Sequence, residues 1–183
     1  MNWFNTFLVL AAAFFAVFWE AAFNGVRNLL GTQIDLLPPL MVYASLYTNI
    51  ISVGLLAFLG GLMFDSLSAN PLGVTVLPLF LVGMVIHLKR DLILRDQTFA
   101  QAVLGLAASA LVPILSLLLM LTMGDTPLLG WGSLWQLLVM AIGGAVATPV
   151  CFEVFGWLQR TLVHQADTQS SFRADREIRR GRS

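Results

Sequence analysis

Asp65 has the most conspicuous chemistry in this sequence, because it is an acidic side chain within a long apolar stretch. An ionisable group at bilayer depth is costly unless it reaches water, a partner or a lipid headgroup. Two roles are open for its carboxylate: it closes the following turn by accepting backbone N–H bonds, or it meets a partner protein. Asn70 is a good N-cap and Pro71 suits a first helical position, so we expect the next helix to begin there. Gly73 would then lie in the first turn, where a larger side chain would push against the preceding helix.

A second polar group lies at the far end of the same expected helix. Gly83, His87 and Arg90 are spaced at i, i+4 and i+7, which places them on one helix face. One interpretation is a polar patch that binds a partner or a lipid headgroup. The other is the end of a membrane span, where long basic side chains reach the cytoplasmic interface.

The other reactive residue types predict neither catalysis nor metal binding. His87 and His164 lack the neighbouring cysteines or carboxylates of a metal site. Cys151, the single cysteine, lies in an apolar run and is expected to be a packing residue. Glu20 is expected to be exposed at the membrane interface. Because the sequence also lacks the motifs of metalloproteases, P-loop NTPases and serine hydrolases, we expect no enzyme activity, no metal and no cofactor.

The composition is that of a membrane protein. Of 183 residues, 58% are hydrophobic and 11% are charged, whereas soluble domains carry about 25% charged residues. The net charge of zero gives no indication of nucleic-acid binding. Several apolar runs approach the roughly 20 residues that cross a bilayer as a helix. We therefore predict an all-α, polytopic membrane protein, with helices at about residues 3–23, 50–64, 71–88, 98–123 and 131–158.

One apolar segment leaves the number of spans open. Residues 36–47 are apolar but too short for the usual hydrocarbon thickness, so they form either a short tilted span or a re-entrant segment. The bundle then has six transmembrane helices, or five if this segment does not cross. Residues 1–160 form the membrane domain, and residues 161–183 form a polar, arginine-rich tail. The basic 89–95 loop and this tail both belong in the cytoplasm, which places the C-terminus there.

Two of the expected helices carry small residues four positions apart, a spacing that favours close helix packing. Gly105 and Ser109 form such a pair on the first of them, and the second carries two, Gly143 with Ala147 and Gly144 with Thr148.

The segment Gly61–Gly83 resembles the signature of the rod shape-determining protein MreD family. That family has a Gly-Leu-x-x-Asp turn, a Pro-Leu-Gly that opens the next helix, and a later Leu-Val-Gly followed by a basic residue. The corresponding residues here are Gly61, Leu62, Asp65, Pro71, Leu72, Gly73, Leu81, Val82, Gly83 and Arg90. The resemblance extends, through size and helix layout, over about residues 1 to 160.

The resemblance implies a non-enzymatic subunit of the bacterial cell-elongation machinery in the inner membrane. Its partners would be MreC, the transglycosylase and transpeptidase of lateral peptidoglycan synthesis and, indirectly, MreB filaments, together with membrane lipid. The family is also similar in architecture to the substrate-binding membrane subunits of energy-coupling-factor vitamin transporters. A small-molecule-binding membrane subunit is therefore the alternative function.

Overall fold

The structure, a computed structural model, describes residues 3–22, 31–32, 34–68, 71–93, 97–124 and 130–170. Within these ranges every regular element is an α-helix. The helices are α1 (Trp3–Ala22), α3 (Leu37–Tyr47), α4 (Ile50–Leu67), α5 (Val76–Lys89), α6 (Thr98–Thr122) and α7 (Trp131–Ser170). Two compact units divide the chain, residues 1–151 and residues 152–183, so that α7 contributes to both.

Four of the described helices are long and apolar enough to cross a membrane: α1, α4, α6 and the part of α7 from Trp131 to Leu158. The all-helical prediction is confirmed for the described residues. Helices α5 and α3 are shorter, at 14 and 11 residues. Helix α7 continues through polar sequence to Ser170, beyond the predicted end at residue 158.

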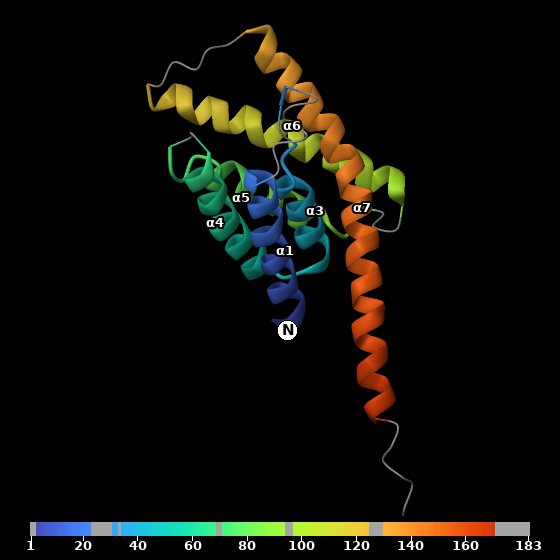
Figure 1. The fold of residues 1–183 in the computed structure, drawn as a ribbon. Helices are drawn as coiled ribbons and strands as arrows, with labels where there is room; N and C mark the ends of the chain where they lie inside the picture. Colours follow the sequence, from blue (N-terminus) through green and yellow to red (C-terminus); the bar gives the residue numbers. More distant parts are fainter. Residues whose placement is uncertain are drawn as a thin grey trace, which may run out of the picture. The chain divides into compact units, whose positions relative to one another are not determined.

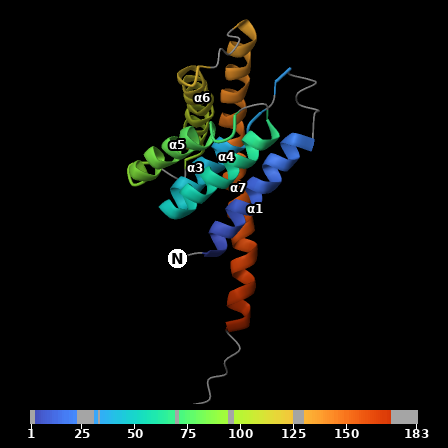
Figure 2. The same cartoon turned by 90° about the vertical axis from the view of Figure 1, so that its left-hand side faces the viewer.

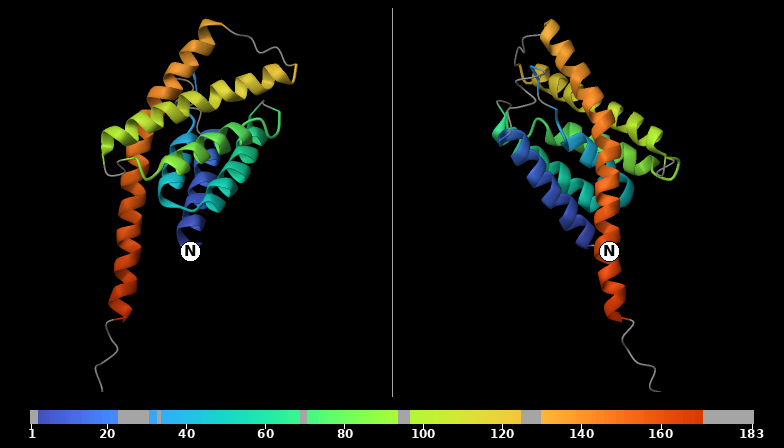
Figure 3. Two further views of the ribbon diagram at one scale, coloured as in Figure 1. Left: turned by 180° about the vertical axis from the view of Figure 1, so that it is seen from behind. Right: turned by 45° about the vertical axis from the view of Figure 1, so that its right-hand side comes forward.

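Helix α3 forms the core of the first unit. Every residue from Leu37 to Leu46 is buried, because α1, α4, α5 and α6 all contact this helix (Figures 1 and 2). A helix that is apolar on all sides is stable only when it is surrounded. The view from behind shows α6 on the other side of α3 and α5 from α1 and α4 (Figure 3). The segment whose path the sequence left open is therefore an enclosed helix of the bundle.

Small residues bring α6 and the first part of α7 into backbone contact. A Cβ added to Gly105 would lie 2.5 Å from the carbonyl oxygen of Gly144 and would also strike Thr148. A Cβ added to Gly144 would strike Ser109. Of the predicted pairs, Gly105 with Ser109 and Gly144 with Thr148 therefore face each other, and the absence of side-chain bulk lets the two backbones meet. Gly143 instead faces Ile34.

The predicted start of the helix after Asp65 is wrong. Helix α5 begins at Val76, and Pro71 precedes a turn that extends to Thr75. The physical reason is competition for backbone N–H groups: Asp65 accepts hydrogen bonds from Gly73 and Thr75 and thereby holds this segment as a turn. Asn70, the predicted N-cap, lies outside the described residues.

Candidate functional site

The connection between α4 and α5 is a closed corner built around Asp65. The side chain is 1% exposed. Its Oδ2 accepts hydrogen bonds from the backbone N–H groups of Gly73, at 2.9 Å, and Thr75, at 3.1 Å. Its Oδ1 accepts a third from the Thr75 hydroxyl. This is the turn-closing role considered from the sequence, and contact with a partner protein stays a prediction.

Two glycines give the corner its shape. Gly61 lies where α4 meets the start of α5, and a Cβ there would be 2.9 Å from Cα of Val76. Gly73 has φ +91°, a left-handed conformation that other residues rarely adopt. A Cβ on Gly73 would meet nothing within 4 Å, so the expected collision with the preceding helix is wrong. Glycine is needed at Gly73 because of the backbone conformation, and at Gly61 because there is no room for a side chain.

Substitution of Gly73 should therefore follow backbone preference and not side-chain volume. We expect Gly73→Val to lower stability by about 1–3 kcal/mol, because a β-branched residue is strained at positive φ. Gly73→Asn should cost less, since asparagine tolerates left-handed backbone better. The measurement is the apparent melting temperature of the purified variants in detergent. Equal losses for both variants would show that the conformation of Gly73 is not what the corner requires.

Two further acidic residues hold the start of α3. Glu20 Oε1 accepts a hydrogen bond from the N–H of Leu36 at 2.6 Å, and Asp35 Oδ1 accepts one from the N–H of Leu37 at 2.8 Å. Glu20 is buried, so its predicted exposure is wrong: the start of an enclosed helix needs acceptors for its free N–H groups. Asp35 was not singled out, although an acidic residue just before a proline-rich helix start is a typical capping signal.

The environment of Asp35 favours its neutral form. Asp35 precedes α3 and is 5% exposed. Burial raises the pKa of this carboxyl above its usual range, the N–H of Leu37 acts in the opposite direction, and the nearby Asp65 carboxylate raises the pKa further. Asp35 and Thr75, an Asp65 partner, line the same cavity, described below.

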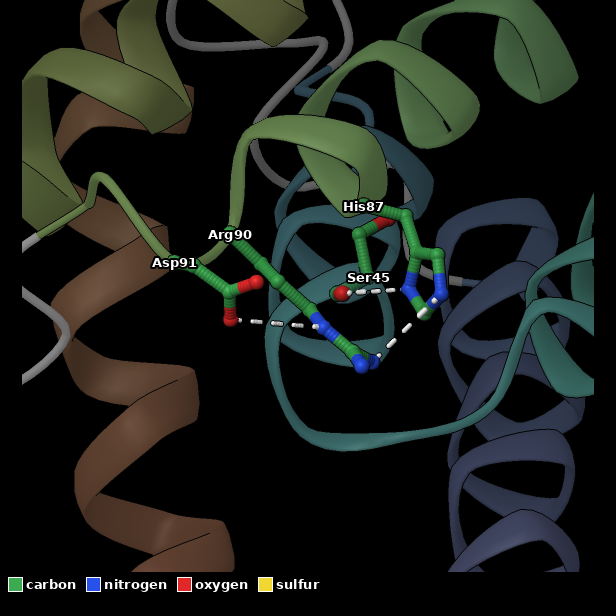
Figure 4. A network of polar contacts seen from close by, with 4 residues as sticks. All are labelled: Ser45, His87, Arg90 and Asp91. Atoms are coloured by element: carbon green, nitrogen blue, oxygen red, sulfur yellow. Dashed lines mark hydrogen bonds and ion pairs between the residues drawn. The ribbon is translucent and has the colours of Figure 1, made fainter.

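Two residues of the predicted polar face, His87 and Arg90, form a chain of polar contacts with Ser45 of α3 and with Asp91 (Figure 4). Gly83 is buried, and a Cβ there would lie 2.6 Å from Sδ of Met41 on α3. His87 Nδ1 lies 2.9 Å from the carbonyl oxygen of Ser45, in the last turn of α3. Arg90 Nη1 lies 3.4 Å from His87 Nε2, and Arg90 Nε lies 3.8 Å from the carboxylate of Asp91.

The hydrogen bonds of His87 require one tautomer. A carbonyl oxygen can only accept, so Nδ1 donates to Ser45, and a guanidinium can only donate, so Nε2 accepts from Arg90. His87 therefore satisfies a carbonyl that the end of α3 leaves free and ties α3 to α5. A role in binding a partner or headgroup stays a prediction for Arg90, which is half-buried.

A cavity of about 830 Å³ lies at the Asp65 end of the first unit. Its walls come mainly from the second half of α6 and the first turns of α7. Most of the lining is apolar, with Phe64, Ile114, Leu117 and Met140 among the residues that contribute. No local sequence pattern indicates this cavity, because its walls come from segments far apart in the chain.

Among the described residues no group of three or more histidine, cysteine or acidic side chains could hold a metal ion. No known protein family, no curated protein and no solved structure matches this chain.

Proposed function

We propose that this chain is a non-enzymatic scaffold subunit of the cell-elongation complex in the bacterial inner membrane, where it binds MreC. The helices cross the bilayer with the C-terminus in the cytoplasm, and the wall-synthesis transglycosylase and transpeptidase lie in the same complex. MreB filaments act on it indirectly. The proposal rests on the resemblance of Gly61–Gly83 to the MreD family.

The observation that supports this proposal is the local structure of that segment. Gly61 permits close approach of α4 and the start of α5, Asp65 closes the turn, and Gly73 supplies its left-handed residue. The three residues that carry the first half of the resemblance therefore act together in one corner. Such a motif is expected where a fixed backbone shape, and not a reacting side chain, is the common requirement.

Depletion of the protein from a rod-shaped host tests the proposal. We expect wide or rounded cells, because lateral wall synthesis would fail, and re-expression of the wild-type chain should restore the rod shape. MreC should co-purify with the chain after crosslinking in membranes. Unchanged cell shape together with loss of vitamin uptake would contradict the scaffold function.

The cavity favours a second candidate function, a small-molecule-binding membrane subunit of a vitamin transporter. Its volume falls within the roughly 300–1,000 Å³ of ligand pockets. Asp35, Thr75 and Ser116 add polar groups to its apolar wall, as such pockets usually require. A vitamin retained through purification, and an uptake defect on deletion, are the results that this alternative predicts.

A further inference from the structure

Ser116 on α6 is the residue that points to a ligand in the cavity. It lines the cavity and is 9% exposed, and its hydroxyl has no hydrogen-bond partner among the described residues. Ser109 on the same helix also lacks a partner, but it packs against Gly144 of α7 and does not line the cavity, whereas the buried Thr148 hydroxyl bonds the carbonyl of Gly144 at 2.8 Å. A buried hydroxyl without a partner is unfavourable, so a group inside the cavity is the natural partner for Ser116.

Ser133 and Gln136 also line the cavity and can donate as well as accept, whereas Asp35 and Thr75 offer a ligand acceptors. Thr75 gives its hydroxyl hydrogen to Asp65, so towards a ligand its oxygen can only accept. The Asp35 carboxylate accepts one bond, from Leu37, and a carboxylate has capacity for more. Among the described residues that line the cavity there is no lysine or arginine. Among these described residues a phosphate or carboxylate would find no cation. An ammonium group would find acceptors, and its positive charge would offset the burial of Asp35 and favour the ionised carboxylate.

The cavity extends along α6 and α7 for a length that can hold part of an acyl chain. On α7 the lining extends from Trp131 to Met140, and on α6 from Pro113 to Met120. At 1.5 Å per residue these stretches measure roughly 14 Å and 10 Å along the helices. Both helices are long and apolar enough to cross a membrane. Asp35 and Thr75 lie in the connections that precede α3 and α5, and the α6 and α7 walls are mainly apolar, with Ser116, Ser133 and Gln136 as their polar residues.

We propose that this cavity binds a membrane lipid with a primary amine in its headgroup, with the amine directed to Asp35 and Thr75 and an acyl chain along α6 and α7. Ser116 provides a further hydrogen bond to the ligand. The site is independent of MreC binding, since the residues that form it are already together in the chain alone. It also differs from a vitamin site in its ligand, which is a membrane lipid and not a water-soluble molecule.

Native mass spectrometry of the purified full chain tests this site. The probes are phosphatidylethanolamine and phosphatidylglycerol with identical acyl chains, titrated into delipidated protein. We expect the wild type to bind phosphatidylethanolamine about tenfold more tightly, the effect of one charge-assisted hydrogen bond. Equal affinity for the two lipids would overturn the proposal. So would displacement of both lipids by a water-soluble vitamin at equimolar concentration, which would favour the transporter alternative.

Two variants assign the binding to the cavity. Asp35→Asn keeps an acceptor for Leu37 but removes the charge, so it should abolish the preference for the amine lipid. Ser116→Phe should fill the cavity and lower the affinity for both lipids. Leu118→Phe is the matched control, because Leu118 is exposed two residues away on α6. Melting temperatures show whether each variant folds. If Ser116→Phe does not fold, the lipid preference of Asp35→Asn alone decides between the outcomes. An unchanged preference in Asp35→Asn would overturn the proposal.

Discussion

Replacing Asp65 with leucine should lower the stability of the protein by roughly 3 kcal/mol or more, since each buried donor left unpaired costs about 1–3 kcal/mol. Three donors lose their acceptor in this variant: the N–H groups of Gly73 and Thr75 and the Thr75 hydroxyl. The turn before α5 would lose both carboxylate oxygens of Asp65, the side-chain acceptors described for it. The measurements are the abundance of the variant in membranes and its apparent melting temperature in detergent.

Asp65→Asn separates the structural role from a role in partner binding. The asparagine oxygen can accept from both backbone N–H groups, and the Thr75 hydroxyl can turn to accept from the amide nitrogen. We therefore expect near wild-type abundance for Asp65→Asn. Reduced co-purification of MreC with this variant at normal abundance would instead assign a cationic partner group to Asp65. Ser66→Leu, at the exposed neighbouring position, is the control for the added leucine. Wild-type stability of Asp65→Leu would show that the corner does not depend on these bonds.

Gly105→Ala should separate α6 from the first part of α7. The added methyl group would lie 2.5 Å from the carbonyl oxygen of Gly144, and backbone cannot move aside as a flexible side chain can. We expect a loss of at least about 1–3 kcal/mol, the usual cost of overpacking. Because α6 and α7 also form the cavity, lipid binding should fall together with the melting temperature.

Gly132→Ala is the matched control for this variant. Gly132 lies in the first turn of α7, and a Cβ there would meet nothing within 4 Å. Alanine has a higher helix propensity than glycine, so Gly132→Ala should be neutral or slightly stabilising. If Gly105→Ala and Gly132→Ala behaved alike, the close contact between α6 and α7 would be wrong.

Apolar length and composition by themselves determined the class and most of the helices. The predicted ranges 3–23, 36–47 and 98–123 agree with α1, α3 and α6 to within one residue at each end. The reason is physical: a run of apolar residues can satisfy its backbone groups in a membrane only as a helix. Spacing alone likewise singled out the small residues that lie at the contact between α6 and α7, because small side chains let two helix backbones approach closely, but it did not show which helices meet.

Only the tertiary structure decided the start of α5 and the role of α3. Helix propensity favours a start at Pro71, but the Asp65 carboxylate, from another helix, takes the N–H groups of Gly73 and Thr75 and delays the helix to Val76. The enclosure of α3 depends on four neighbouring helices. The sequence of α3 by itself indicates only that all sides of the helix are apolar. The cavity, with Asp35 and Ser116 in its wall, exists because segments distant in the chain meet there. The spacing of apolar residues within one helix does not indicate which distant segments will pack together.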